Sequence, residues 1–345
     1  MFRFNSLFLA GVLLSLTACN NTQHVYPDSR EFFGGQIHIT LYDIDEATAT
    51  QVFRILWEDF EYMHAMWQPW QPGSLGRTNT LLALNREFTA NPSVLPLIEK
   101  SRSLSSASNY LYNPAIGKLA ELWGFQHDTA PTGPPPAAEH IQSLVTLNPT
   151  LNDIEVQGVR MKGTNPALKL DFGTLAKGLA MDRSMLTLQQ LGVKHAIIDA
   201  GGDVKVMGNR GDQPWQVAIA APRDTTILAG LRIFDGECVF TSSEYDQYFD
   251  YKGKRYHRIL DPRTGYPGDA TSLVTVIHPD AATAAAATTA LFVAGPAEWD
   301  SIARHMQISL VMLIDKQGRV HMTPAMATRV QFSRQPEQIV VRPSL

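Results

Sequence analysis

The stretch LDFGTLAKGLAMDR, residues 170–183, decides how the rest of this sequence is interpreted. We expect a strand to end at Asp171, a bend at Gly173 and Thr174, and a helix that begins near Lys177. Backbone N–H groups at such a bend form a partly positive concavity, to which a lysine adds a full charge. The stretch is therefore a candidate phosphate-binding turn, although an ordinary strand–turn–helix corner with a solvated lysine fits the same residues.

The N-terminal segment MFRFNSLFLAGVLLSLTAC has the features of a secretory signal. Arg3 precedes an apolar run from Leu7 to Leu16, which is shorter than the roughly 20 residues that a membrane-spanning helix needs. Leu16-Thr17-Ala18-Cys19 resembles a bacterial lipobox, in which Cys19 receives lipid. A short transmembrane anchor is the alternative that this length disfavours.

This N-terminus predicts the division of the chain. We expect a lipoprotein signal peptide at 1–18, a lipidated tether at 19–30 and a single folded domain at 31–345. The lipid would anchor the domain on the periplasmic side of the bacterial cell membrane, at the inner rather than the outer membrane. With 44% hydrophobic and 18% charged residues, the composition is that of a globular enzyme. A net charge of −4 and the lack of a basic stripe argue against nucleic-acid binding.

The chain divides into a helical first part and a β-rich second part, separated by the proline-rich loop 131–136. Apolar spacings of three and four predict helices over 45–66, 93–107 and 114–124. Short β-rich runs follow at 195–199, 204–207, 215–220, 231–234, 256–260, 273–277 and 309–314, interrupted by one helix after Lys177 and another from 281 to about 294. This order predicts an α+β fold, in which helices flank a mixed, largely antiparallel sheet within one large domain of two lobes.

Three further stretches contain candidate site residues. Ala-Gly-Gly-Asp at 200–203 permits positive φ and close approach of a ligand, or is a plain hairpin turn. His257 in KRYHRILDPRTGYP can exchange a proton with a reacting oxygen, or is a structural histidine. Tyr112 and Asn113 precede a proline in NYLYNPAIGKLAELWGF and are extended, so they can present polar groups to a flat heterocycle.

Taken together, these stretches resemble the FAD:protein FMN transferase family of ApbE-like flavin transferases. The resemblance runs from about residue 32 to residue 315 and includes PGSLGRTN, YNPAIGKLAELWGF, DFGTLAKGLAMDR, DAGGDVKVMG, VFTSSEYDQYF, YHRILDPRTGYP and TTALFVAG. It implies an ApbE-like, T-fold-related fold. It also implies an enzyme that cleaves the pyrophosphate of FAD, attaches the FMN half to a threonine or serine of a flavoprotein of a membrane redox complex, and releases AMP.

The resemblance also implies roles for individual residues. FAD would be contacted by Trp67, Leu111, Tyr112, Asn113, Asp171, Lys177 and the backbone at Ile259. Thr174 and Thr289 would provide oxygen ligands for Mg²⁺, and Lys177 with the metal would compensate the phosphate charge. His257 would lie beside the scissile phosphates as a candidate base.

One position departs from the family pattern. An aspartate usually precedes the metal-binding threonine by four residues, so that both lie on one helix face. Here Thr289 is present, but the matching residue is Ala285. Two functions follow from this change: a working transferase whose metal site is altered, or an FAD-binding lipoprotein with weak or no transferase activity.

Overall fold

The computed structural model of the chain describes residues 24–127, 129–222 and 226–342. The predicted signal peptide and Cys19 lie outside these ranges. Within them, no helix combines the length and the apolar character that crossing a membrane requires.

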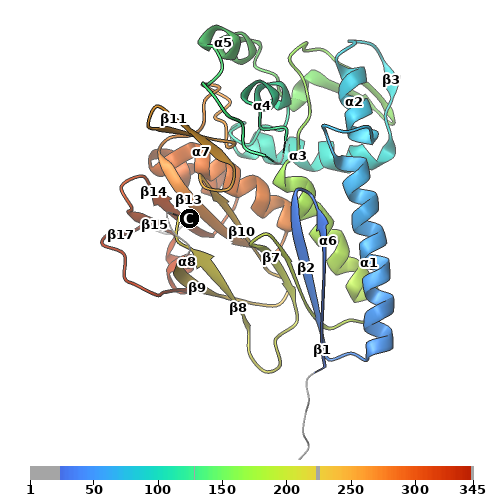
Figure 1. Cartoon of the computed structure of the whole chain (residues 1–345), viewed down its shortest axis with the longest axis vertical. Helices are drawn as coiled ribbons and strands as arrows, with labels where there is room; N and C mark the ends of the chain where they lie inside the picture. The colour runs from blue at the N-terminus through green and yellow to red at the C-terminus, as the bar shows by residue number, and fades with distance from the viewer. Residues whose placement is uncertain (1–23, 128, 223–225, 343–345) are drawn as a thin grey trace, which may run out of the picture.

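A nine-stranded sheet forms the centre of the fold (Figure 1). Neighbouring strands pair antiparallel, except that β15 and β17 pair parallel. In spatial order the strands are β1 (Val25–Phe32), β2 (Gly35–Tyr42), β6 (His195–Ala200), β7 (Asp203–Met207), β10 (Cys238–Ser243), β13 (Thr271–His278), β14 (Leu310–Asp315), β15 (Val320–Met322) and β17 (Ile339–Val341). The α+β class with a largely antiparallel sheet is therefore confirmed.

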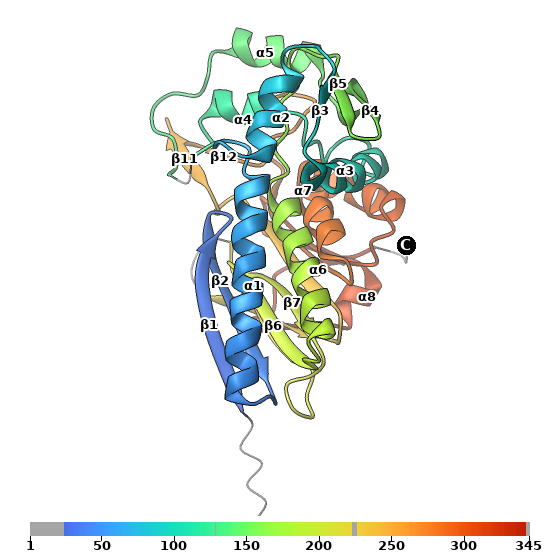
Figure 2. The same cartoon turned by 90° about the vertical axis from the view of Figure 1, so that its right-hand side faces the viewer.

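Two layers cover the faces of this sheet. Helices α1 (Glu46–Trp67), α6 (Thr174–Gln190) and α7 (Ala281–His305) bury one face, and α1 and α6 run side by side (Figure 2). A second sheet of β8 (Trp215–Ala220), β9 (Ile227–Ile233) and β16 (Val330–Phe332), with the short helix α8 (Pro324–Ala327), packs on the other face. Both faces of the central sheet are thus apolar, which fits the continuous burial of strands such as β13.

An upper lobe lies above the end of α6 in both views (Figures 1 and 2). It contains α2 (Ser74–Leu82), α3 (Leu95–Ala107), α4 (Gly117–Trp123), α5 (Ala138–Leu147), the small sheet β3 (Phe88–Thr89), β5 (Arg160–Gly163) and β4 (Ile154–Gln157), and the hairpin β11 (Tyr248–Tyr251) and β12 (Lys254–His257). A separate apolar cluster around Trp123 joins α4, α5 and this hairpin. The indole N–H of Trp123 donates to the Gly265 carbonyl at 2.8 Å, which ties the loop after β12 to α4.

Helix α6 is fastened to the start of α7. A Cβ at Gly178 would lie 2.6 Å from the Ala281 carbonyl oxygen, so only glycine permits this approach without displacement. One turn later, the Asp182 carboxylate accepts from the backbone N–H groups of Ala281 and Ala282 and pairs with Lys205 at 2.9 Å. These contacts set where the first turn of α6 lies.

The structure corrects four expectations about element boundaries. The tether expected at 19–30 is wrong from Val25 onward, because β1 pairs with β2 along its whole length. No strand ends at Asp171, since Lys169 makes only an isolated bridge with Ile116. The strand expected over 256–260 ends at His257. The helix expected to stop at 294 resumes after a break at Gly295, where φ is +66°.

Candidate active site

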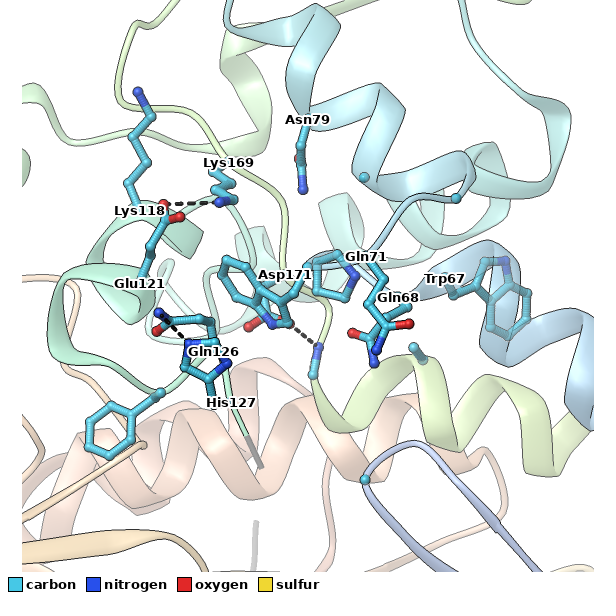
Figure 3. Close-up of a pocket in the computed structure, with 18 of the residues that line it drawn as sticks. Trp67, Gln68, Gln71, Asn79, Lys118, Glu121, Gln126, His127, Lys169 and Asp171 are labelled. Carbon is cyan, nitrogen blue, oxygen red and sulfur yellow. Dashed lines mark hydrogen bonds and ion pairs between the residues drawn. The ribbon is translucent and has the colours of Figure 1, made fainter. Parts of the chain in front are cut away.

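A cleft of about 1300 Å³ lies between the upper lobe and the N-terminal end of α6 (Figure 3). We call it the main cleft. Its size is ample for a dinucleotide, since drug-sized ligands occupy pockets of roughly 300–1,000 Å³. Its lining includes Phe33, Trp67, Gln68, Trp70, Gln71, Arg77, Asn79, Lys118, Glu121, Phe125, Lys169, Asp171, Gly173, Thr174, Lys177, Gln247 and Arg258.

The bend at Asp171 forms one wall of the main cleft. The Asp171 carboxylate accepts from the Gly173 N–H at 3.0 Å, and Gly173 has φ of +50° directly before the first residue of α6. Burial raises the pKa of Asp171, against the Gly173 hydrogen bond and the charges of Arg258 and Lys169. The corner predicted from the sequence is therefore open to a cleft, with the N-terminus of a 17-residue helix at its edge.

Lys177 lies one turn into α6 and points to the turn between β6 and β7. Its ammonium group donates to the Ala200 carbonyl at 2.9 Å and forms an ion pair with Asp203. Gly201 and Gly202 have φ of +71° and +90°, which the expected glycine turn requires. The sequence predicts that Lys177 compensates the charge of a bound phosphate, whereas in the structure it pairs with the Asp203 carboxylate.

A second cleft of about 850 Å³ adjoins this turn, and we call it the second cleft. It is lined by the β1–β2 hairpin, the β6–β7 turn, the end of β8 and the segment after β10. The residues shared by the main and second clefts are Phe33, Gly34, Thr174, Lys177, Gln247 and Arg258. Two hollows therefore meet at the first turn of α6, which is the arrangement that a reaction between two bound molecules needs.

A smaller hollow of about 150 Å³ lies behind the Asp171 corner, and we call it the inner pocket. Leu111, Tyr112, Asn113, Ile259 and Thr289 line it, together with Asp171, Thr174, Asp246 and Arg258. The structure thus brings together most of the FAD-contacting residues that the family resemblance implied. Trp67 lines the main cleft instead, with its indole N–H donated to the Ser93 carbonyl at 2.9 Å.

The polar groups of Tyr112 and Asn113 already have partners inside the protein. The Asn113 amide donates to the Pro149 carbonyl at 2.9 Å, and its oxygen accepts from the Ala115 N–H at 3.0 Å. The Tyr112 hydroxyl lies 3.2 Å from that of Ser101. The sequence predicts that backbone and amide groups here face a heterocycle; in the structure, the Asn113 amide instead orders the loop that shapes the inner pocket.

His257 is buried and does not line any of these three cavities. Its Nε2 lies 2.8 Å from the Gly268 carbonyl and so carries the proton, while Nδ1 accepts from the Ile259 N–H at 3.3 Å. Burial, the largest effect, lowers the pKa of His257 to about 4. Both nitrogens are engaged in holding the loop 257–268, so its role as a base stays a prediction that this geometry does not support.

The neutral state of His257 predicts a pH dependence of stability. A histidine whose pKa falls on folding contributes stability above pH 6.5, and this contribution is lost as the pH falls towards 4. We expect wild type to lose up to about 3 kcal/mol more than His257→Gln across this window. Denaturant unfolding of both proteins from pH 7 to pH 4 measures the difference. Parallel pH curves would contradict this account of His257.

Two of the three predicted metal positions, Thr174 and Thr289, line the inner pocket, and the third, Ala285, does not. Thr174 lines all three cavities and Thr289 lines the inner pocket, but Ala285 is fully buried and its carbonyl accepts the Thr289 hydroxyl at 3.3 Å. Over the described ranges, no group of three or more His, Cys, Asp or Glu side chains is placed to hold a metal ion.

Sequence reasoning missed two residues of this site, Asp246 and Arg258. Arg258 lines all three cavities, and Asp246 lines the second cleft and the inner pocket. A signal was present for Arg258, because neighbouring side chains of an extended segment point to opposite sides. Because His257 faces the core, the next residue, Arg258, faces the cleft.

Comparisons with known proteins identify the family of this chain. Residues 33–312 match the sequence profile of the ApbE family. An FAD:protein FMN transferase of Rhodobacter capsulatus is 34% identical over 94% of this chain, although the chain spans only 61% of that relative's length. An FAD:protein FMN transferase of Klebsiella pneumoniae is 32% identical over 78% of this chain and 82% of its own length.

Solved structures show the same fold. The ApbE protein of Thermotoga maritima superposes with a TM-score of 0.81 at 25% identity, covering 90% of this chain and all of that one. The apo flavinyl transferase ApbE of Pseudomonas stutzeri gives a TM-score of 0.78 at 24% identity, covering 91% of this chain and 98% of its own. With its profile match spanning most of the sequence, this chain belongs to the ApbE family.

Proposed function

We propose that this chain is an FAD:protein FMN transferase. The observation that carries the proposal is the junction at Thr174 and Arg258, where the main cleft, the second cleft and the inner pocket meet. FAD would occupy the main cleft with its diphosphate at the first turn of α6, where the helix N-terminus favours negative charge. The hydroxyl of an acceptor threonine or serine would approach through the second cleft.

The reaction is a displacement at phosphorus. The acceptor oxygen forms a bond to the phosphorus of the FMN half, the bridging bond to the AMP phosphate breaks, and AMP leaves. The proton of the hydroxyl needs a base on the acceptor side. Asp246 lines the second cleft and the inner pocket, and desolvation there raises its pKa, which suits a proton acceptor.

Mg²⁺ is the cation that the family resemblance implies, and the donor set of this chain does not fit it well. The helix position one turn before Thr289 is an alanine, and the Thr289 hydroxyl donates to the carbonyl of that alanine. Mg²⁺ prefers at least one carboxylate with near-octahedral geometry. Asp171 and Asp246 line the inner pocket, but the cationic side chain of Arg258 lines the same pocket. The transfer step therefore uses only groups of the chain, FAD and the acceptor.

The cellular setting is a further part of the proposal. A lipid on Cys19 would hold the domain at the periplasmic side of the inner membrane, next to an acceptor flavoprotein of a membrane redox complex. Labelling with a palmitate analogue should therefore mark wild type and not Cys19→Ser. The serine variant should also move from the membrane to the soluble fraction.

Flavin transfer tests the activity directly. The purified chain is incubated with FAD and a threonine-containing acceptor, and the gel is examined for covalent flavin fluorescence while AMP is measured in parallel. We expect fluorescence on the acceptor, equimolar AMP, and neither product with the acceptor threonine changed to alanine. Flavin binding without transfer would favour the alternative of an FAD-binding lipoprotein. No flavin binding would contradict both functions.

A further inference from the structure

In the part of the chain that the structure describes, Arg258 faces the junction of the three cavities with no hydrogen bond or ion pair of its side chain. Its side chain is exposed to the clefts. Arg77 also lines the main cleft, but it does not reach the second cleft or the inner pocket. The Arg258 charge acts on the nearby carboxylates of Asp171 and Asp246, but no hydrogen bond or ion pair within the described ranges occupies its N–H groups, so these donors are available to a ligand.

The lysines of the main cleft are engaged elsewhere. Lys118 donates to the Pro166 carbonyl at 2.6 Å, and Lys169 pairs with Glu121 at 2.9 Å while lying 4.5 Å from the centre of the Trp70 ring. Lys177 pairs with Asp203. Each of the latter two charges is compensated by a carboxylate, so neither lysine adds net positive charge to the cleft.

In the inner pocket, Arg258 lies beside the residues at which the family pattern expects a metal ion. Thr174 and Thr289 line this pocket with Asp171 and Asp246, and the cationic side chain of Arg258 lines it beside them. The positive charge of Arg258 acts on both carboxylates and opposes the effect of burial on each pKa. A cation is therefore already built into the position where the family pattern expects a metal ion.

We propose that the guanidinium of Arg258 binds the diphosphate of FAD in place of a divalent cation, so that neither FAD binding nor FMN transfer depends on Mg²⁺. This inference rests on the proposed function. A guanidinium suits the task, because it presents parallel N–H donors to two phosphate oxygens and is always charged. During transfer it stays protonated and only donates hydrogen bonds, while the acceptor oxygen–phosphorus bond forms and the bond to AMP breaks.

Equilibrium binding of FAD and riboflavin tests the proposal. Riboflavin carries the same ring without phosphates, so its affinity reports on the ring site alone. Quenching of flavin fluorescence is measured in EDTA and in millimolar Mg²⁺ for wild type, Arg258→Gln, Arg258→Lys and the control Arg183→Gln. Arg183 lies on the exposed side of α6, away from all three cavities.

We expect wild type to bind FAD equally well in EDTA and in Mg²⁺. Arg258→Gln should weaken FAD binding by roughly 10- to 100-fold, as expected for the loss of charge-assisted hydrogen bonds, and leave riboflavin binding unchanged. The FAD affinity of Arg258→Lys should lie between those of wild type and Arg258→Gln. The affinity of Arg183→Gln should match that of wild type. Transfer by wild type should persist in EDTA.

Two results would overturn the proposal: wild-type FAD binding or transfer that needs Mg²⁺, or FAD binding by Arg258→Gln that equals the control. The wild-type comparison in EDTA decides the matter even if Arg258→Gln folds poorly. Failure of the proposed function looks different, because wild type would then bind neither flavin under either condition.

Discussion

Lys177→Met is expected to lower the free energy of unfolding by about 3 kcal/mol, because removing one member of a buried ion pair leaves the other charge uncompensated. The side chains of Lys177 and Asp203 are only 16% and 6% exposed. FAD binding should weaken as well, since the remaining carboxylate repels the diphosphate. Denaturant unfolding and FAD titration measure the two effects.

A double variant distinguishes two explanations for weaker FAD binding: loss of the Lys177–Asp203 ion pair, or loss of a direct contact between Lys177 and the phosphates. In Lys177→Met with Asp203→Asn no charge is left unpaired, and the amide oxygen can still accept the Thr241 N–H that Asp203 now accepts at 3.0 Å. We expect the double variant to recover most of the stability and to bind FAD more tightly than the single variant. If the double variant binds FAD as weakly as Lys177→Met alone, Lys177 contacts the phosphates directly and the electrostatic explanation is wrong.

Ala285→Asp is expected to destabilise the protein by about 3 kcal/mol or more, because it places a carboxylate at a fully buried position. Added Mg²⁺ should restore part of this loss, since a carboxylate four residues before Thr289 lies on the same helix face and creates a cation site. The melting temperature with and without Mg²⁺ measures both effects.

Ala287→Asp is the matched control. Ala287 is equally buried on α7, but it lies two residues from Thr289 and therefore on another face of the helix. The control should lose stability without responding to Mg²⁺. An Ala285→Asp protein that is as stable as wild type, or that ignores Mg²⁺, would show that this position does not face the cation site.

Local patterns in the sequence predicted the parts of the fold whose causes are local. The apolar spacing over 45–66 matches α1, which begins after Asp45 caps the Thr48 N–H at 3.0 Å. The strands β6, β7 and β8 were found within one residue of their ends, because turn residues bound them. The strand β1 was missed because VYPDSREF contains a proline and mostly exposed polar residues, so its order depends on pairing with β2 and on the packing of Tyr26 and Phe32 against the core.

In the site, too, the sequence predicted only the features that depend on neighbouring residues. The bend from Asp171 to Thr174 was predicted from the sequence, because a turn and a helix N-terminus depend on residues that are neighbours in the chain. The pairing of Lys177 with Asp203 depends on how β7 is placed against α6, and no local pattern predicts it. The burial of His257 likewise depends on Gly268 and on Phe292, whose ring centre lies 5.2 Å from the imidazole.

The close approach of α6 to α7 at Gly178 has a mechanical consequence. Because α6 is clamped to α7 through Ala281 and Asp182, the turn that holds Thr174 and Lys177 moves as one body with the central sheet. We therefore expect any rearrangement on FAD binding in segment 67–73, which joins α1 to α2 and forms the opposite wall of the main cleft.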